Sequence, residues 1–262
     1  MPDAGGRLKH ERQARILELL GGSGRVVAAE LEGALGVSAY TVRRDLDELA
    51  QAGRLLRVHG GALPRSPVAT TYEGRREQST AGKREVARAA AGLVRGGEVV
   101  ILDGGSTALA LAEALPPGLS GTWITHSPPA AAALARHPGL EVVVVGGTLD
   151  RRALVATGAQ TVAAYERVAA DVCFLGIWSV HAEHGISEGY PEEAEVRRTL
   201  LGRADRVVGL ATADKLGTVA PFAIGPASAL THLVTDGAAP AAAVDPLADL
   251  GITVVRGGPG AG

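Results

Sequence analysis

The chain has 262 residues, enough for two domains, and its 46% hydrophobic content with only 3% aromatic residues suits cores built of Ala, Val and Leu. A formal net charge of −2 excludes a chain that is basic throughout. No run of about 18 apolar residues and no apolar signal segment is present, so we expect a soluble, cytoplasmic protein without a membrane span. The single cysteine, Cys173, excludes an internal disulfide.

The first part of the chain predicts two short helices followed by a tight turn. Residues 7–20 and 27–35 each carry apolar side chains at helical spacing, and the Gly-rich residues 21–24 separate them. Gly36-Val37-Ser38 leaves room only for a tight turn before a third helix. Positive charge is concentrated here, with ten Lys and Arg against eight Asp and Glu in residues 1–65. Two helices joined by so short a turn are typical of a helix-turn-helix.

The third helix, residues 38–49, has one face for a protein core and another for an anion. Apolar side chains recur along it at helical spacing, and Ser38 is a good N-cap. The polar side chains near its start lie off the apolar stripe, where a helix in the major groove meets base edges and phosphates. The alternative is a surface helix whose arginines are only solvated. We predict DNA contacts from Ser38, Tyr40, Thr41, Arg43 and Arg44.

Residues 53–62 predict a wing beside this helix. Gly53 favours a helix C-cap, residues 54–58 form a short expected strand, and residues 59–62 lead back from it. Arg57 and His59 of the wing complete the predicted DNA-binding set. We therefore predict that residues 1–62 form a winged helix-turn-helix domain.

The motif residues of this head resemble the signature of DeoR-family bacterial transcription regulators. The matching stretches are Val37-Ser38, Thr41-Val42-Arg43-Arg44-Asp45-Leu46, Leu49, Gly53 and Arg57-Val58-His59-Gly60-Gly61-Ala62. The resemblance implies a head that binds operator DNA. It also implies an effector domain similar in fold to ribose-5-phosphate isomerase and related sugar-phosphate enzymes, and it covers nearly the whole chain.

Residues 63–81 show a change of composition. Pro, Ser, Thr and charged residues dominate there, and no apolar period is sustained. We interpret this segment as an interdomain linker, expected to be a solvated connector, with contact between its basic residues and flanking DNA as the alternative.

Residues 82–262 alternate between helix and strand signals. We expect helices over residues 83–94, 107–115, 130–135 and 192–203, and strands over residues 99–102, 122–125, 141–145, 172–175, 207–210, 232–234 and 253–255. Continuous apolar strands between helices are typical of a mostly parallel sheet covered on both faces. The predicted fold class is therefore α/β, with a Rossmann-like effector domain behind the winged head.

A candidate anion site follows the strongest of these strands. Asp103-Gly104-Gly105-Ser106-Thr107 comes directly after it and opens a helix. The glycines let the backbone approach a ligand, the hydroxyls donate hydrogen bonds, and a helix N-terminus carries partial positive charge. The P-loop and dinucleotide motifs are both missing. The loop predicts binding of a phosphorylated small molecule without a cofactor.

Further polar loops follow other strands, where ligands of open α/β sheets bind. The resemblance places the family's effector site at the loop of Asp103, at Thr125 and Ser127, and near Lys215. Two departures are His126, where asparagine is common, and Ala213-Asp214-Lys215, which is shorter than the usual Asp-x-Ser-Lys. The predicted effector-binding set is Asp103, Gly104, Gly105, Ser106, Thr107, Thr125, Ser127, Gly147, Glu188 and Lys215.

Two other side-chain pairs invite a simpler interpretation. Glu193 and Arg197 stand four residues apart on an expected helix, which is first of all a stabilising pair. His181 and His184 have a spacing that a metal accepts, but no third ligand is organised with them, so we predict no metal site.

The leading hypothesis is a DNA-binding transcription regulator, a repressor, whose operator affinity depends on a phosphorylated sugar or related metabolite. Symmetric operators require paired heads, so a homodimer or homotetramer is expected. One alternative is a sugar-phosphate isomerase fused to a DNA-binding head, with Asp103 and Glu188 as acid/base groups and Lys215 on the phosphate or oxyanion. Another is a head that binds only a protein partner.

Overall fold

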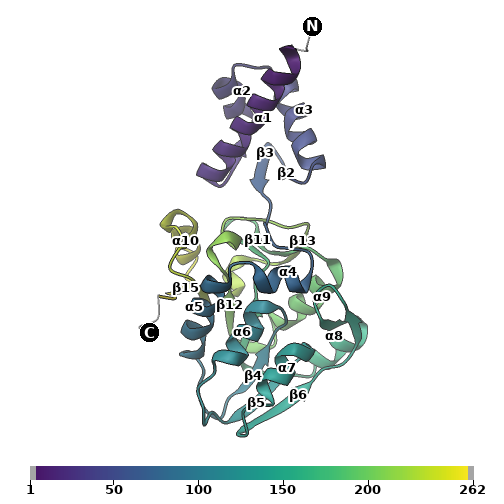
Figure 1. Cartoon of the computed structure of the whole chain (residues 1–262), viewed down its shortest axis with the longest axis vertical. Helices are drawn as coiled ribbons and strands as arrows, with labels where there is room; N and C mark the ends of the chain where they lie inside the picture. Colours follow the sequence, from purple (N-terminus) through teal and green to yellow (C-terminus); the bar gives the residue numbers. More distant parts are fainter. Residues whose placement is uncertain (1–3, 259–262) are drawn as a thin grey trace.

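Three helices and a small sheet form the head of the molecule. The structure, a computed structural model, describes residues 4–258, and it describes side chains for residues 9–21 and 24–258. The head comprises α1 (Ala4–Ser23), β1 (Val26–Val27), α2 (Ala28–Leu35), α3 (Ala39–Gln51), β2 (Leu55–Val58) and β3 (Gly61–Pro64). In Figure 1 it stands above a larger α/β domain, into which β3 leads.

The core of the head is the apolar stripe of α3 together with the sides of α1, α2 and β2 that face it. It contains Ile16, Leu20, Leu31, Val42, Leu46, Leu49 and Leu55. Two ion pairs join α1 to α3. Lys9 lies 2.6 Å from Glu48, and the guanidinium of Arg12 contacts both carboxylate oxygens of the fully buried Asp45, one of them at 2.9 Å. Apolar packing and these ion pairs together fix the outer face of α3.

Local signals set the ends of α3 and the shape of the wing. The Ser38 hydroxyl accepts a hydrogen bond from the Thr41 amide at 3.3 Å, which confirms the N-cap. Gly53 takes φ of 70°, and the Arg54 amide then reaches the Leu49 carbonyl at 2.8 Å. Strands β2 and β3 pair antiparallel, and β3 also pairs with β1. These features confirm the winged helix-turn-helix.

Residues 65–79, which we call the connecting segment, are more ordered than a solvated connector. They contain the short helix α4 (Tyr72–Glu77), in which Tyr72 and Arg75 are buried. Arg65 forms an isolated parallel bridge with Val219 of the larger domain. The expectation of a solvated connector is therefore wrong for Val68, Tyr72 and Arg75, which tertiary contacts bury without any periodic pattern in the sequence, whereas Glu73 and Arg76 of the same segment are exposed. The domain limits that we placed at 62 and 81 stay a prediction.

A seven-stranded parallel sheet forms the centre of the larger domain. Its order is β15-β14-β12-β9-β4-β5-β6. The strands are β4 (Val99–Leu102), β5 (Gly121–Thr125), β6 (Leu140–Val144), β9 (Ala170–Gly176), β12 (Ala204–Leu210), β14 (His232–Thr235) and β15 (Thr253–Arg256). The chain adds β5 and β6 on one side of β4, then crosses to add β9 on the other side. The switch point of this topology therefore lies between β4 and β9.

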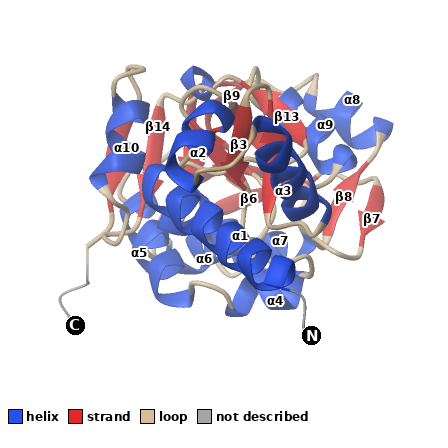
Figure 2. Cartoon of the chain, turned by 90° about the horizontal axis from the view of Figure 1, so that it is seen from above, coloured by secondary structure: helices blue, strands red, loops and turns tan. Residues whose placement is uncertain are grey.

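Helices cover both faces of the sheet, which explains why its inner strands are apolar throughout. On one face α5 (Thr80–Ala91), α6 (Ser106–Ala114) and α7 (Pro128–Leu134) pack on Val100, Leu102, Val172 and Phe174. On the other face α8 (Ala159–Tyr165), α9 (Pro191–Leu200) and α10 (Ala241–Ala248) pack on Ile101, Cys173, Leu175 and Leu233. Figure 2 shows α5 and α6 on one side of the strands and α8 and α9 on the other. The predicted Rossmann-like α/β class is confirmed.

Small antiparallel sheets and 3-10 turns complete the larger domain. One antiparallel sheet contains β10 (Ser179–His181), β11 (Gly185–Glu188) and β13 (Phe222–Gly225), and another contains β7 (Thr148–Asp150) and β8 (Val155–Thr157). Two 3-10 turns span Ala213–Lys215 and Ala227–Ala229. None of the helices in residues 4–258 combines the length and apolar character that crossing a membrane requires.

Candidate functional site

The exposed face of α3 carries the predicted DNA contacts. Tyr40 is 74% exposed, and both Arg43 and Arg44 are exposed, while Val42 between them is fully buried. The Thr41 hydroxyl lies 3.1 Å from the Ser38 hydroxyl, so these two residues close the start of the helix. The helix therefore presents one aromatic side chain and two guanidinium groups beside an ordered N-terminus, as reading a major groove requires.

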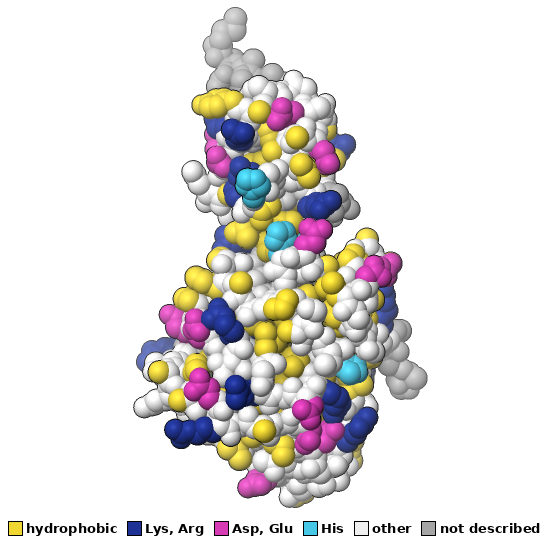
Figure 3. Space-filling model, turned by 180° about the vertical axis from the view of Figure 1, so that it is seen from behind, with side chains coloured by type: hydrophobic (Ala, Val, Ile, Leu, Met, Phe, Trp, Pro, Cys, Tyr) yellow, Lys and Arg dark blue, Asp and Glu magenta, His cyan; other side chains and the backbone are white. Residues whose placement is uncertain are grey.

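The two predicted DNA-contacting residues of the wing, Arg57 and His59, differ in their contacts within the protein. Arg57 donates from Nε to Asp47 at 2.9 Å and from Nη1 to the Gly61 carbonyl at 2.8 Å, so it ties the wing to α3. His59 is exposed at the tip of the two-residue turn. Figure 3 shows basic and acidic side chains interspersed over both domains on the face it displays. Binding of DNA by Arg57 and His59 stays a prediction, and the structure gives Arg57 an anchoring role in addition.

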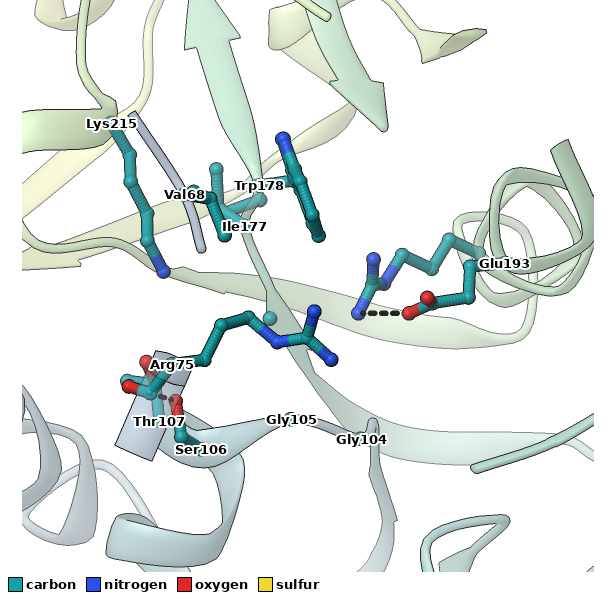
Figure 4. Close-up of a pocket in the computed structure, with 12 residues that line it drawn as sticks. Val68, Arg75, Gly104, Gly105, Ser106, Thr107, Ile177, Trp178, Glu193 and Lys215 are labelled. Carbon is teal, nitrogen blue, oxygen red and sulfur yellow. Dashed lines mark hydrogen bonds and ion pairs between the residues drawn. The ribbon is translucent and has the colours of Figure 1, made fainter. Parts of the chain in front are cut away.

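A cavity lies at the switch point between β4 and β9, above the carboxyl ends of these strands (Figure 4). It is lined by Val68, Arg75, Gly104, Gly105, Ser106, Thr107, Gly176, Ile177, Trp178, Glu193, Arg197 and Lys215. Its volume is about 30 Å³, which is room for about two water molecules. A neighbouring cavity of about 10 Å³ shares Val68, Arg75, Ser106 and Lys215 with it. Five of the ten predicted effector-binding residues therefore meet here.

The glycine loop after β4 forms the floor of this cavity. A Cβ on Gly104 would meet Cγ1 of Val155 at 2.1 Å, so only glycine fits there. Gly105 takes φ of 93° and precedes the first turn of α6, and Ser106 and Thr107 of that turn line the cavity. The Ser106 hydroxyl donates to the carbonyl of Arg75 at 3.2 Å. The loop thus combines close backbone approach with a helix N-terminus, which suits an anion.

At the wall of the cavity, the guanidinium of Arg197 contacts three carboxylates. Its Nε donates to Asp103 at 2.8 Å, Nη1 contacts Glu188, and Nη2 lies 3.5 Å from Glu193. All four side chains are buried, and the Gly176 amide also donates to Asp103 at 2.9 Å. The predicted pair of Glu193 and Arg197 is confirmed as part of this larger cluster. Asp103 and Glu188 do not line the cavity, so they support its wall through Arg197.

Burial changes the protonation of two groups at this wall. It raises the pKa of Glu193 to about 7, with further repulsion from Asp103 and Asp150. It also lowers the pKa of His126 to about 4, so this imidazole is neutral. His126 Nδ1 lies 2.9 Å from the Tyr165 hydroxyl and Nε2 lies 3.5 Å from Asp103. The histidine that departs from the family pattern therefore contacts Tyr165 and Asp103 and does not line the cavity.

Two cations line the cavity without a carboxylate partner. Lys215 is 9% exposed, and its ammonium has no ion-pair or hydrogen-bond partner in the described part of the chain. Burial lowers the pKa of Lys215 to about 7, with repulsion from Lys83 next in size. Arg75 is 7% exposed and bonds only to backbone carbonyls. Figure 4 shows both side chains pointing into the space above Ser106 and Gly105.

Asp214 and Lys83 complete the surroundings of these cations. Asp214 accepts hydrogen bonds from Gln78 at 2.9 Å and from Thr212 at 2.6 Å, so neutral groups hold it beside Lys215. Lys83 donates to the carbonyls of Arg75 and Gln78. Burial lowers the pKa of Lys83 to about 8.

The remaining predicted effector residues lie outside the cavity lining. The Thr125 hydroxyl accepts from the Ser127 amide at 3.1 Å, and the Ser127 hydroxyl caps α7 by accepting from Ala130. A Cβ on Gly147 would lie 2.1 Å from the Thr161 hydroxyl, so its role is close packing. These three residues have structural partners, and effector contact from them stays a prediction.

Sequence reasoning missed several lining residues, chiefly Arg75, Trp178 and Val68. Arg75 and Val68 belong to the connecting segment, whose composition predicted a linker. Trp178 follows β9, one of the strands whose carboxyl ends meet at the cavity. Its position after an apolar strand was the signal that could have placed it there.

Two family models match this chain. Residues 78–237 match the DeoR C terminal sensor domain, and residues 12–67 match the DeoR-like helix-turn-helix domain. The chain belongs to the DeoR family of transcriptional regulators. We call the larger domain of this DeoR-family protein its sensor domain from here on.

Named relatives span nearly the whole of this DeoR-family chain. It is 33% identical to the HTH-type transcriptional regulator GlpR of Haloferax volcanii, over 95% of this chain and 98% of that protein. It is 32% identical to the HTH-type transcriptional regulator GolR of Listeria innocua, over 86% and 90%. It is 29% identical to the glycerol-3-phosphate regulon repressor of Escherichia coli, over 91% and 95%. These relatives are regulators, which favours the regulator over the isomerase alternative.

Among solved structures, ribose 5-phosphate isomerase A of Neisseria gonorrhoeae matches 51% of this chain and 52% of its own. The sequence identity is 20% and the TM-score 0.38. A likeness this distant says nothing about chemistry, and the membership of the DeoR family rests on the sequence matches.

Proposed function

We propose that this DeoR-family regulator represses transcription by binding operator DNA through α3, and that a phosphorylated sugar or related metabolite in the switch-point cavity controls its operator affinity. One observation carries the second part. Lys215 and Arg75 are buried at the cavity beside the N-terminus of α6, and in the described residues neither forms an ion pair, although Glu193 lines the same cavity and Asp214 lies beside Lys215. Buried charge is costly unless it is paired, so binding of an anion would stabilise these two cations.

The charge of the cavity lining favours a phosphate. Two cations and a helix N-terminus suit a dianion, and a phosphate monoester carries about −1.5 to −2 charges at neutral pH. One relative supports a metabolite of this class by name, since it is a glycerol-3-phosphate regulon repressor. The lining also contains the glycine loop, the hydroxyl residues Ser106 and Thr107, and Trp178, which can hold the rest of a small polyol or sugar.

The head supports sequence-specific binding of DNA as a paired assembly. A single recognition helix contacts one half-site, so we propose that the protein acts as a homodimer or homotetramer on a symmetric operator in the cytoplasm. Binding that weakens with salt, in proportion to the phosphates neutralised, would separate this function from a head that binds only a protein partner.

A thermal-stability screen of phosphorylated sugars and polyols tests the sensor function. A true effector at about 100 times its dissociation constant stabilises the fold by about 2.7 kcal/mol. The unphosphorylated form of the same compound should leave the melting temperature unchanged. Equal stabilisation by both forms, or turnover of an aldose phosphate, would contradict this proposal.

A further inference from the structure

The connecting segment forms the roof of the effector cavity. Val68 and Arg75 of this segment line it, and Arg75 also lines the neighbouring small cavity. Neither cavity, at about 30 and 10 Å³, holds a ligand of the usual size, which needs about 300 Å³ or more. Arg75 is one of four residues that line both cavities, together with Val68, Ser106 and Lys215. A ligand of that size therefore needs more space than these two cavities provide, and the roof is one of their walls.

Several hydrogen bonds hold the roof on the sensor domain, and the side chains of Ser66, Gln78 and Arg75 donate three of them. The Ser66 hydroxyl donates to the carbonyl of Trp178 at 2.7 Å. The Gln78 amide donates to Asp214 at 2.9 Å, and Arg75 Nη2 donates to the carbonyl of Arg152 at 2.9 Å. Trp178, whose carbonyl accepts the bond from Ser66, and Arg75, which donates to Arg152, both line the cavity. The roof is thus tied to the same loops that surround the ligand space.

The bonds of Arg75 are weak for a buried guanidinium. Besides the bond to Arg152, its Nη1 reaches the carbonyls of Ala69 and Thr70 at 3.4 Å each, near the limit of a hydrogen bond. Its guanidinium carbon lies 5.4 Å from the ring centre of Trp178. Arg197, at the opposite wall, has three carboxylates around the same type of group. Arg75 is therefore the arginine of this site that can exchange its partners for an anion.

We propose that Arg75 is a second phosphate-recognition residue, and that the phosphate takes its guanidinium in exchange for the backbone carbonyls that it bonds in the ligand-free form. A guanidinium binds two phosphate oxygens in parallel, and charged bonds of this kind are stronger than bonds to carbonyls. Lys215 supplies the opposing cation. This inference rests on the proposed sensor function and adds a residue that arrives from outside the sensor fold.

This exchange of partners couples effector binding to the position of the head. The connecting segment follows β3, which is a strand of the wing, and the Val219 amide bonds the Pro64 carbonyl at its start at 3.1 Å. A phosphate that draws Arg75 from Ala69, Thr70 and Arg152 loosens or shifts this segment. The position of α3 relative to the sensor domain changes with it. Effector and operator then influence each other's affinity to the same extent.

Titration of the full-length protein with inorganic phosphate, at constant ionic strength adjusted with chloride, tests the role of Arg75. The readouts are the melting temperature and the fluorescence of Trp178, one of two tryptophans, with Trp178→Phe as the blank. Arg75→Ala should weaken phosphate binding about ten- to hundredfold and abolish the fluorescence change. Arg75→Lys keeps the positive charge but not the planar guanidinium, so its phosphate affinity should lie between those of the wild type and Arg75→Ala.

Arg76→Ala is the matched control, because Arg76 is exposed on the same helix. It should bind phosphate as the wild type does. Full phosphate affinity and fluorescence response in both Arg75 variants, together with loss of binding in Lys215→Ala, would overturn this inference and leave the sensor function standing. Binding that survives in Lys215→Ala as well, or a wild type that ignores phosphate, would overturn the sensor function itself.

Discussion

Arg43 and Arg44 on α3 of the head are exposed, whereas Arg75 and Arg197 in and above the sensor domain are 7% and 6% exposed. An exposed guanidinium stays hydrated until it meets a partner, so it suits a large polyanion that approaches from solvent. A buried one must have its partners built in. Arg197 has them as carboxylates and Arg75 as carbonyls, and this difference separates a structural arginine from one available to a ligand.

The largest expected effect comes from removing the built-in cation. Arg197→Met leaves the carboxylates of Asp103, Glu188 and Glu193 buried without their cation. The free energy of unfolding should fall by about 3–5 kcal/mol, as measured by urea denaturation. Arg198→Met is the control, since Arg198 is 45% exposed and pairs of that kind contribute about 0–1 kcal/mol. Equal losses in the two variants would remove the contrast between buried and exposed arginine.

The next effect concerns the ligand cation. Lys215→Ala should weaken effector binding by about 1.5–3 kcal/mol, or about ten- to hundredfold, because one charge-assisted contact to the phosphate is lost. Operator affinity without effector should stay unchanged, since α3 belongs to another domain. Calorimetry for the effector and gel-shift titration for DNA measure the two. Ser106→Ala should act in the same direction but more mildly. A full effector response in Lys215→Ala would show that the cavity is not the effector site.

The exposed arginines should show the reverse selectivity. Arg43→Ala and Arg44→Ala should each weaken operator binding by about 1–3 kcal/mol and leave effector binding as it is. A base contact would relax sequence preference, whereas a phosphate contact would weaken all sequences alike. Titrations against operator and scrambled DNA separate these cases. Unchanged binding in both variants would end the assignment of α3 as the recognition helix.

The smallest effect is a pH dependence confined to the sensor domain. The Lys215 pKa is lowered to about 7 in the ligand-free protein, and a bound phosphate raises it by favouring the ammonium. Effector affinity should therefore fall as pH rises above about 7, by at most about tenfold per pH unit. Ionisation of Glu193, with its pKa raised to about 7, acts in the same direction because it adds negative charge.

Calorimetry between about pH 6.5 and 8.5, in a pair of buffers that differ in ionisation enthalpy, measures this proton uptake. Lys215→Arg should flatten the profile, because arginine keeps its charge throughout. Operator binding through α3 should stay flat for the same reason. A wild-type effector affinity that is constant across this range would exclude Lys215 as the titrating phosphate ligand.

The sequence predicted the head better than the cavity because the signals of the head are local. The cap at Ser38, the glycine at Gly53 and the stripe of α3 act within a few residues of each other. The sheet was predictable for a similar reason, since its inner strands are continuous apolar runs. Short Ala-rich helices such as α8 and α10 carry little periodicity, and they were not predicted.

The cavity is built from contacts that span the chain. Arg197 and Asp103 are 94 residues apart in sequence, and Arg75 bonds the carbonyl of Arg152 77 residues away. The pair of Glu193 and Arg197 was visible as a spacing, but its main partner Asp103 was not. Nothing near Arg75 in sequence marks it as buried, because its burial comes from Trp178 and from the loops after other strands.

Operator affinity in the presence and absence of phosphorylated compounds tests the central claim most directly. DNA selected by the protein from a random library would be titrated with the protein, alone and with each phosphorylated sugar or polyol and its unphosphorylated form. We predict that one phosphorylated compound changes the dissociation constant by about 5–150-fold, that its unphosphorylated form does not, and that Lys215→Ala abolishes the change. An effect shared by both forms, or retained in Lys215→Ala, would contradict a phosphate-controlled sensor at this cavity.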